Sequence, residues 1–218
     1  MAVLMRVVTM RTADLPFDEL NKLIYQYDYS DKLINQMKKR IVDSFANCKL
    51  RIRSVFFSSS KAIAYSKRLY DGLWKDCKRT MLRIGKHYWS ECDDEWLYLF
   101  LTDYDPVWKV VYENEQDRKR ARFVEGVLAS DKVPEKGEVI DRSMRDWARM
   151  IGNMGIEVVD RAMIDRFKAE GVKRVMWITT PDERVCEECL AMDRQIYPID
   201  KVPDKPHPNC RCRLLPVK

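Results

Sequence analysis

The sequences WITTPDERVCEECLAMDRQIYPID, residues 177–200, and KPHPNCRCRLLPV, residues 205–217, decide how the C-terminal end folds. They place Cys186 two residues before Cys189 in a C-x2-C pair and, after seventeen further residues, bring in His207, Cys210 and Cys212. A C-x2-C pair directs two thiolates at one ion, and a second cluster about 15 to 20 residues later closes a tetrahedral site. Five candidate ligands are therefore present where a structural zinc ion takes four.

Two other interpretations of this cluster remain open from the sequence. The cysteines could be reduced thiols or disulfides, although disulfides are rare inside cells. The cluster could also be catalytic, either as a Cys/His nucleophile pair or as a zinc ion with an open position for water. No acid or base partner is specified for such chemistry, because Glu187, Glu188 and Asp193 are equally well explained as solvated loop charges. A structural metal site is the favoured interpretation.

A structural ion also has a physical task here. A C-terminal module of about forty residues is too small to be held together by burial of apolar surface alone. We therefore expect zinc to stabilise the chain from about residue 175 onward, and its removal to leave the preceding helices folded.

Short strands are predicted around the cluster. Residues 172–180 are rich in β-branched and aromatic side chains and end at a proline, which indicates a strand. Two further short strands fit residues 195–199 and 212–217. Before them, a long amphipathic stripe from Asp141 ends at Gly171, a natural helix stop.

The rest of the chain has helical periodicity. Apolar residues recur at steps of three and four, which places them on one helix face. This spacing predicts helices over residues 17–49, 61–90, 94–100 and 107–128. The first of these helices could be broken near residues 29–31. Residues 129–140 lack periodicity and contain Pro134 and Gly137, which predicts a linker. The expected fold is mainly α with a small α+β C-terminal module. It divides into a helical region at 1–128, the linker at 129–140 and a metal-stabilised domain at 141–218.

The whole-chain composition fits a folded protein. Of 218 residues, 46% are hydrophobic and 34% are charged, with few glycines and prolines, so global disorder is excluded. No apolar run approaches the roughly 18 residues that a membrane span needs, and the N-terminus lacks a signal-peptide cleavage site. We expect a protein made in the host cytoplasm with no membrane partner. The scattered Cys48, Cys77 and Cys92 are expected to be buried small hydrophobes.

Charge is unevenly distributed along the chain. Residues 32–90 carry fifteen Lys and Arg against three acids, whereas residues 91–117 carry nine acids against Lys109 alone. The basic block is interleaved with aromatic residues and could contact DNA phosphates or an acidic protein surface; a solvated helix face is the alternative. The candidate contact residues are Lys38, Lys39, Arg40, Lys67 and Arg68. His87, in the same block, has no cysteine at ligand spacing and is expected to be an ordinary histidine.

The C-terminal sequence resembles a known family. The order W-I-T-T-x-D-x-R-V-C-x-x-C, an Asp-containing turn, H-P-N-C-R-C and a final strand is similar to the C-terminal signature of the phage Mu F / SPP1 gp7-type head-morphogenesis proteins. The similarity spans roughly residues 141–217, and the family's motif positions fall on Asp182, Arg184, Cys186, Cys189, Asp193, His207, Pro208, Asn209, Cys210, Arg211 and Cys212. The family often has a glycine after the Asp of the turn, where this chain has Arg194.

The resemblance implies a non-enzymatic minor head protein. Such a protein would act in head morphogenesis at the portal vertex inside the virion, with the portal protein as partner, a major capsid or scaffold protein as a further one, and packaged double-stranded DNA as a potential contact. The alternative is a zinc-containing nuclease of the HNH type or another nucleic-acid-processing protein. A nuclease would need a general-base histidine and a metal carboxylate besides the structural ligands, and the only other histidine is His87.

Overall fold

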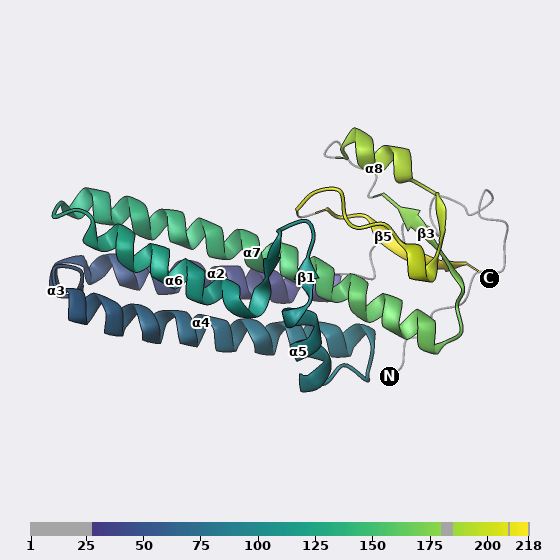
Figure 1. Ribbon diagram of the computed structural model, residues 1–218, viewed down its shortest axis with the longest axis horizontal. Coiled ribbons are helices and arrows are strands. Elements are labelled where there is room, and N and C mark those ends of the chain that lie inside the picture. The colour runs from purple at the N-terminus through teal and green to yellow at the C-terminus, as the bar shows by residue number, and fades with distance from the viewer. Residues whose placement is uncertain (1–27, 180–184, 209, 218) are drawn as a thin grey trace.

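The protein is a bundle of long helices with a small sheet at one end (Figure 1). The computed structural model describes residues 28–179, 185–208 and 210–217, and the statements below concern these residues. The predicted class, mainly α with a small α+β C-terminal module, is confirmed. The part of the first predicted helix before residue 28 lies outside the described residues.

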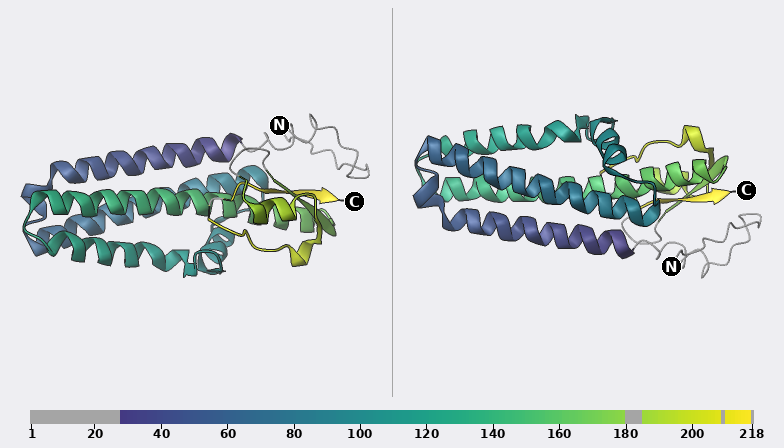
Figure 2. Two further views of the ribbon diagram at one scale, coloured as in Figure 1. Left: turned by 90° about the horizontal axis from the view of Figure 1, so that it is seen from above. Right: turned by 90° about the horizontal axis from the view of Figure 1, so that it is seen from below.

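Four helices form the bundle: α2 (Asp28–Leu50), α4 (Ser59–Tyr88), α6 (Tyr112–Leu128) and α7 (Val133–Ala169). The short α3 (Ile52–Val55) turns the chain from α2 into α4. The apolar stripes predicted from periodicity face inward: α2, for example, buries Leu33, Met37, Ile41 and Phe45. Two views at right angles to Figure 1 show the four helices running side by side along the long axis (Figure 2).

Aromatic rings fill the bundle near the α3 end. The ring of Phe123 lies 6.1 Å from Phe45, 5.7 Å from Phe56 and 5.6 Å from Tyr70, and Tyr70 in turn meets Trp147 edge-on at 5.5 Å. Edge-to-face pairs of this kind add to the free energy of simple burial. One core therefore joins all four long helices.

The predicted linker at residues 129–140 is corrected by the structure. Helix α7 begins at Val133, so only residues 129–132 lie between α6 and α7. Pro134 falls in the first turn of α7, where its missing N–H would have no partner in any case. Gly137 lies inside the helix, and Lys136 stabilises the junction by donating a hydrogen bond to the carbonyl of Val127 at the end of α6. The proline therefore marks a helix start here, and the division into domains stays a prediction.

The helix predicted over residues 107–128 begins later than expected. After α5 (Asp94–Thr102), the chain forms a hairpin of β1 (Tyr104–Asp105) and β2 (Val110–Val111), and α6 begins at Tyr112. The carboxylate of Asp105 accepts hydrogen bonds from the backbone N–H groups of Val107 at 2.8 Å and Trp108 at 3.1 Å. A side chain that binds its own following backbone in this way diverts the chain from helix into a turn.

The three strands predicted near the C-terminus form one sheet. Strand β3 (Arg174–Ile178) lies between β4 (Ile196–Pro198) and β5 (Arg213–Val217) and is antiparallel to both. The chain enters β3 from α7 through Gly171, whose φ of 77° lets the N–H groups of residues 171 and 172 bind back to the carbonyls of residues 168 and 167. Between β3 and β4 lies α8 (Glu187–Met192), and the short 3-10 helix Ile199–Lys201 follows β4. The sheet packs beside the C-terminal half of α7.

Candidate metal centre

The five predicted ligands meet where two loops of the C-terminal module approach each other. Cys186 precedes α8 and caps it, because its Sγ atom accepts a hydrogen bond from the N–H of Cys189 at 3.4 Å. His207, Cys210 and Cys212 lie on the segment that leads directly into β5. We call these five side chains the cysteine–histidine cluster. It joins the connection between β3 and β4 to the start of β5.

The spacing of the donor atoms suits a tetrahedral ion. The Sγ atom of Cys189 lies 3.6 Å from that of Cys210 and 3.4 Å from Nε2 of His207. Zinc–sulfur bonds of about 2.3 Å and zinc–nitrogen bonds of about 2.0 to 2.1 Å at tetrahedral angles separate two sulfurs by about 3.8 Å and a sulfur and a nitrogen by about 3.6 Å. All seven cysteines of the chain are free thiols. The cluster could therefore hold a metal ion.

Cys189 is the central donor of the cluster. Two sets of three donor atoms each lie within 4.8 Å of one another, Cys186, Cys189 and His207 in the first and Cys189, Cys210 and Cys212 in the second. Cys189 belongs to both sets. Its side chain is buried together with those of Cys210 and Cys212, whereas Cys186 and His207 are half-exposed. An ion held here would have thiolates on its inner side and a histidine toward solvent.

The thiols differ in acidity because their neighbours differ. The pKa of Cys210 falls to about 5 because Cys212 donates a hydrogen bond to its sulfur and the ammonium of Lys205 lies nearby. Burial raises the pKa of Cys189 to about 12. The pKa of Cys212 rises because its proton is held in the hydrogen bond to Cys210. Thiolate ligands carry no proton, so a bound cation would have to displace these protons.

The Asp-containing turn holds the cluster's loop against the sheet. Oδ1 of Asp193 accepts hydrogen bonds from both the backbone N–H and the hydroxyl of Thr179, each at 2.8 Å. Residues 192–195 form a turn closed by a 3.0 Å hydrogen bond from the N–H of Gln195 to the carbonyl of Met192. Arg194 has a φ of 60° in this turn, a conformation that favours glycine. The backbone thus adopts a shape that glycine would suit, with an arginine in its place.

Lys205 fastens the cluster's segment to the helical bundle. Its ammonium pairs with Oδ2 of Asp160 on α7 at 3.0 Å, donates a hydrogen bond to the carbonyl of Cys212 and lies 4.8 Å from the ring centre of Trp177. The two charged side chains are only 10% and 14% exposed. An ion pair so shielded from solvent is screened little by salt. We call this arrangement the Lys205 clasp.

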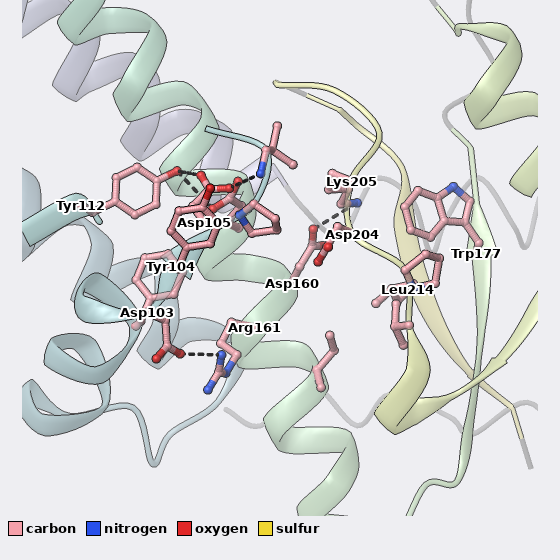
Figure 3. Close-up of a pocket in the computed structure, with 17 residues that line it drawn as sticks. Asp103, Tyr104, Asp105, Tyr112, Asp160, Arg161, Trp177, Asp204, Lys205 and Leu214 are labelled. Carbon is pink, nitrogen blue, oxygen red and sulfur yellow. Dashed lines mark hydrogen bonds and ion pairs between the residues drawn. The ribbon is translucent and has the colours of Figure 1, made fainter. Parts of the chain in front are cut away.

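A cavity of about 400 Å³ lies beside the Lys205 clasp, between the β1–β2 hairpin, α7 and the sheet (Figure 3). On its hairpin side the hydroxyl of Tyr112 lies 2.9 Å from Oδ2 of Asp105 and 3.1 Å from Oε2 of Glu157. Burial and the nearby carboxylate of Asp105 raise the pKa of Glu157 to about 8. This group of polar side chains gave no sequence motif, because its members come from three separate elements.

The five basic candidates form two separate groups along the bundle. Lys38, Lys39 and Arg40 lie on α2, and Arg40 pairs with Asp76 of α4 at 2.6 Å. Lys67 and Arg68 lie on α4 about nine residues before Asp76, hence about 13 Å further along the helix axis. The structure therefore does not bring the two groups together.

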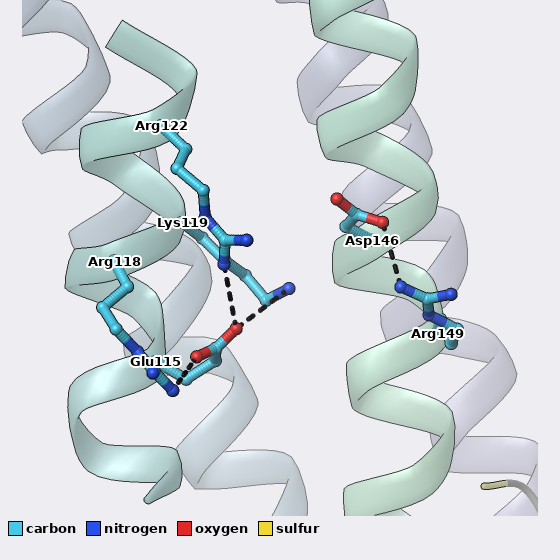
Figure 4. Close-up of polar contacts among 6 residues, drawn as sticks. All are labelled: Glu115, Arg118, Lys119, Arg122, Asp146 and Arg149. Carbon is cyan, nitrogen blue, oxygen red and sulfur yellow. Dashed lines mark hydrogen bonds and ion pairs between the residues drawn. The ribbon is translucent and has the colours of Figure 1, made fainter. Parts of the chain in front are cut away.

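The five basic candidates also differ in whether their positive charge is paired with a carboxylate of the same chain. Lys67 pairs with Asp71 at 2.5 Å, whereas Lys38, Lys39 and Arg68 have no carboxylate partner among the described residues. The cations of α6 are different, because Glu115 alone binds Arg118, Lys119 and Arg122 (Figure 4). On α2 and α4 more positive charge remains available for a partner.

The other residues singled out from the sequence are accounted for as follows. Cys48, Cys77 and Cys92 are buried, as expected. His87 is exposed and stacks on the ring of Tyr29, with ring centres 4.0 Å apart. Asp182, Arg184 and Asn209 of the motif lie outside the described residues.

Comparison with family models, with curated proteins and with solved structures finds no match. Within the part of the chain that the structure describes, every helix is too short or too polar to cross a bilayer.

Proposed function

We propose that the chain is a minor head protein of a phage, acting in head morphogenesis at the portal vertex, with zinc in the cysteine–histidine cluster as a structural ion. The proposal rests on one observation: the described motif residues all help to close the same small module. Cys186, Cys189, His207, Cys210 and Cys212 converge as donors, and Asp193 fixes the turn between them. A signature that serves to close a small module is what a structural protein requires.

The choice of zinc follows from the donor set. Thiolate and imidazole ligands in a small tetrahedral site suit zinc, whereas magnesium and calcium prefer oxygen ligands. An ion here would close the chain between α8 and β5 and so stabilise a module with little core of its own.

In this proposal the bundle supplies the partner surfaces. The unpaired cations of α2 and α4 suit an acidic surface of the portal or of a capsid or scaffold protein, or the phosphates of packaged DNA. No observation favours the nuclease alternative. Of the chain's two histidines, His207 is a candidate ligand and His87 is stacked on Tyr29.

The test combines metal content with portal binding. The chain is purified and its metal measured by elemental analysis, and it is co-expressed with the portal protein encoded in the same genome. We expect about one zinc ion per chain, lost in Cys186→Ser/Cys189→Ser, and co-purification of the portal. Cys92→Ala, at a buried cysteine outside the cluster, is the matched control and should keep the zinc. A metal-loaded chain that fails to bind the portal would contradict the assembly function while leaving the metal site intact.

A further inference from the structure

Helix α5 leaves one face without a partner. Its inner face packs on the bundle through Leu97, Phe100 and Leu101. Its outer face combines two acids with two large hydrophobic residues one turn later, in the order Asp94, Glu95, Tyr98 and Leu99. Steps of four residues place these side chains on the same side of a helix. Tyr98 and Leu99 are 59% and 52% exposed, so half or more of each side chain remains in contact with water.

The acids of this surface are not neutralised within the chain. Glu91 and Asp93, at the turn into α5, and Asp94 and Glu95, in its first turn, are exposed and form no ion pair among the described residues. Asp103, just beyond the helix, differs, because it pairs with Arg161 at 3.2 Å. We call the surface of residues 91–99 the α5 face. It carries these four acids around an apolar centre, and Lys75, Lys78 and Arg79 of α4 line the hollow beside Asp94 and Tyr98.

A groove of the opposite character lies between α2 and α4. Its volume is about 360 Å³ and its floor is formed by the buried side chains of Leu33 and Met37. Four cations line it against two acids: Lys39, Arg40, Arg79, Arg83, Asp43 and Asp76. Asp76 is shared by Arg40 and Arg79, while Lys39 and Arg83 have no carboxylate partner among the described residues. We call this the α2–α4 groove.

We propose that the α5 face of one copy of this chain docks into the α2–α4 groove of a second copy. The two surfaces have opposite charge, which favours their association. Both surfaces flank α4, since Arg79 lines the groove and also the hollow beside Asp94 and Tyr98. In the proposed dimer the two copies exchange both contacts about one two-fold axis, so the assembly is closed. This inference does not depend on the proposed function.

The first test measures the mass of the full-length, metal-loaded chain by light scattering during size-exclusion chromatography. At about 0.1 M salt, where the Debye length is about 10 Å, we expect a mass near twice the 25.9 kDa of one chain. At about 1 M salt, where it is about 3 Å, the dimer should weaken. A chain that is monomeric at both salt concentrations would overturn the proposal, and the α5 face would then require a basic partner of another kind.

Charge reversal tests the two surfaces. Asp94→Lys/Glu95→Lys and, separately, Lys39→Glu/Arg83→Glu should each raise the dimer dissociation constant by more than about tenfold. The matched control is Asp131→Lys/Glu138→Lys, which reverses two exposed acids that form no ion pair among the described residues and should leave the dimer unchanged. The neutral variant Asp94→Asn/Glu95→Gln, with circular dichroism of every variant, separates lost contact from lost folding.

Mixing the two reversed variants is the decisive step. Each carries like charges on both surfaces and should be monomeric alone, whereas the mixture pairs opposite charges again and should form a 1:1 complex. A mixture that stays monomeric, or a dimer that survives either reversal, would show that these are not the surfaces that meet.

Discussion

Arg194 occupies a backbone conformation that is unfavourable for a residue with a side chain. Its φ of 60° belongs to the third position of a turn that favours glycine, and the turn lies between α8 and β4. A non-glycine residue in this conformation costs about 1 kcal/mol or more. Among the described residues, its side chain is compensated only by a weak ion pair with Asp193 at 3.8 Å.

Arg194→Gly should therefore stabilise the protein. Glycine removes the steric cost of the positive φ but increases the entropy of the unfolded chain, so we expect a net gain of up to about 1 kcal/mol in the free energy of unfolding. Urea denaturation of the metal-loaded chain would measure it. Arg194→Ala serves as the control, because it removes the guanidinium and keeps the strain. If alanine stabilises as much as glycine does, the strain is not the cause.

Cys189 should matter more to metal binding than the other cysteines. It is the one donor common to both sets of three, so its loss disrupts both. We expect Cys189→Ser to lower metal affinity further than Cys186→Ser or Cys212→Ser, by at least about tenfold. Competition with a chromogenic chelator would rank the three variants. Equal affinities would indicate that the ion does not bind at the shared donor.

Glu157 should make stability depend on pH. Its pKa is about 8 in the folded protein and about 4.3 in an unfolded chain, so the folded state binds the extra proton between these values. The contribution of Glu157 to the free energy of unfolding is therefore greatest at low pH. It falls by about 1.4 kcal/mol per pH unit between roughly pH 5 and pH 8. The groups that face it are Asp105, Tyr112 and Asn153.

Glu157→Gln should remove this loss. The difference in unfolding free energy between the variant and the wild type should grow in the variant's favour from about pH 5 to about pH 8. Metal binding changes with pH in both proteins and cancels in the difference. Glu138→Gln, at an exposed position of the same helix, should show no such trend. A constant difference for Glu157→Gln would mean that its carboxyl is ionised throughout this range.

At this scale the sequence predicted which cysteines and which histidine come together, but not their surroundings. The donors are recognisable because metal coordination restricts residue type and spacing within about thirty residues. Lys205 and Asp160 could not be paired in advance, because an ion pair across forty-five positions depends on how the sheet sits on α7. The cluster of Asp105, Tyr112 and Glu157 was missed for the same reason.

At the scale of elements, Gly155 sets how closely α2 and α7 approach. A Cβ atom at this position would lie 2.5 Å from Cδ1 and 2.7 Å from Cγ1 of Ile34. Real carbon atoms do not approach so closely, and a β-branched side chain in a helix has little freedom to move away. The glycine therefore serves packing, although it weakens α7 locally.

Gly155→Ala should destabilise the bundle by about 1 to 3 kcal/mol through overpacking, despite the better helix propensity of alanine. Gly137→Ala lies in the same helix with open space around it and should instead stabilise by up to about 1 kcal/mol. Thermal unfolding of both variants gives the comparison. Stabilisation by both would show that the contact with Ile34 yields without cost.

Helix periodicity predicted the elements well and their boundaries less well. Repeating apolar positions identified α2, α4, α5, α6 and the later part of α7, and β-branched runs identified the three strands of the sheet. Two boundary errors arose because the same residue type is compatible with two different local structures. Pro134 was interpreted as a break although it starts a helix, and Asp105 was not recognised as the residue that turns the hairpin.

For the whole molecule, metal removal should affect one end only. A strong chelator should open residues 185–217 to trypsin, whose target residues there include Arg194, Lys201 and Arg213. The bundle has its own core, so the helical circular dichroism should fall only slightly. Digestion at different times followed by mass spectrometry would locate the cuts. Unchanged protease sensitivity after confirmed metal loss would contradict a structural ion.

The general plan of the molecule was predictable, but the way its ends are joined was not. The sequence indicated helices followed by a metal-stabilised module, and it suggested a linker between them. In the structure α7 runs without a break from the far end of the bundle to the sheet. Packing of α7 against both parts decides this, and no local pattern reports it.

The Lys205 clasp makes metal binding and docking of the sheet thermodynamically reciprocal. The same ammonium holds the carbonyl of Cys212 in the ligand segment and the carboxylate of Asp160 on α7. If docking on the bundle stabilises the ligand segment in its metal-binding arrangement, a bound ion would stabilise the docked sheet by the same amount. The two equilibria are linked, so the coupling free energy is equal in both directions. The affinity of the whole chain for a bound ion would thus depend partly on α7. Each tenfold gain in that affinity would correspond to about 1.4 kcal/mol of attachment between the two ends of the molecule.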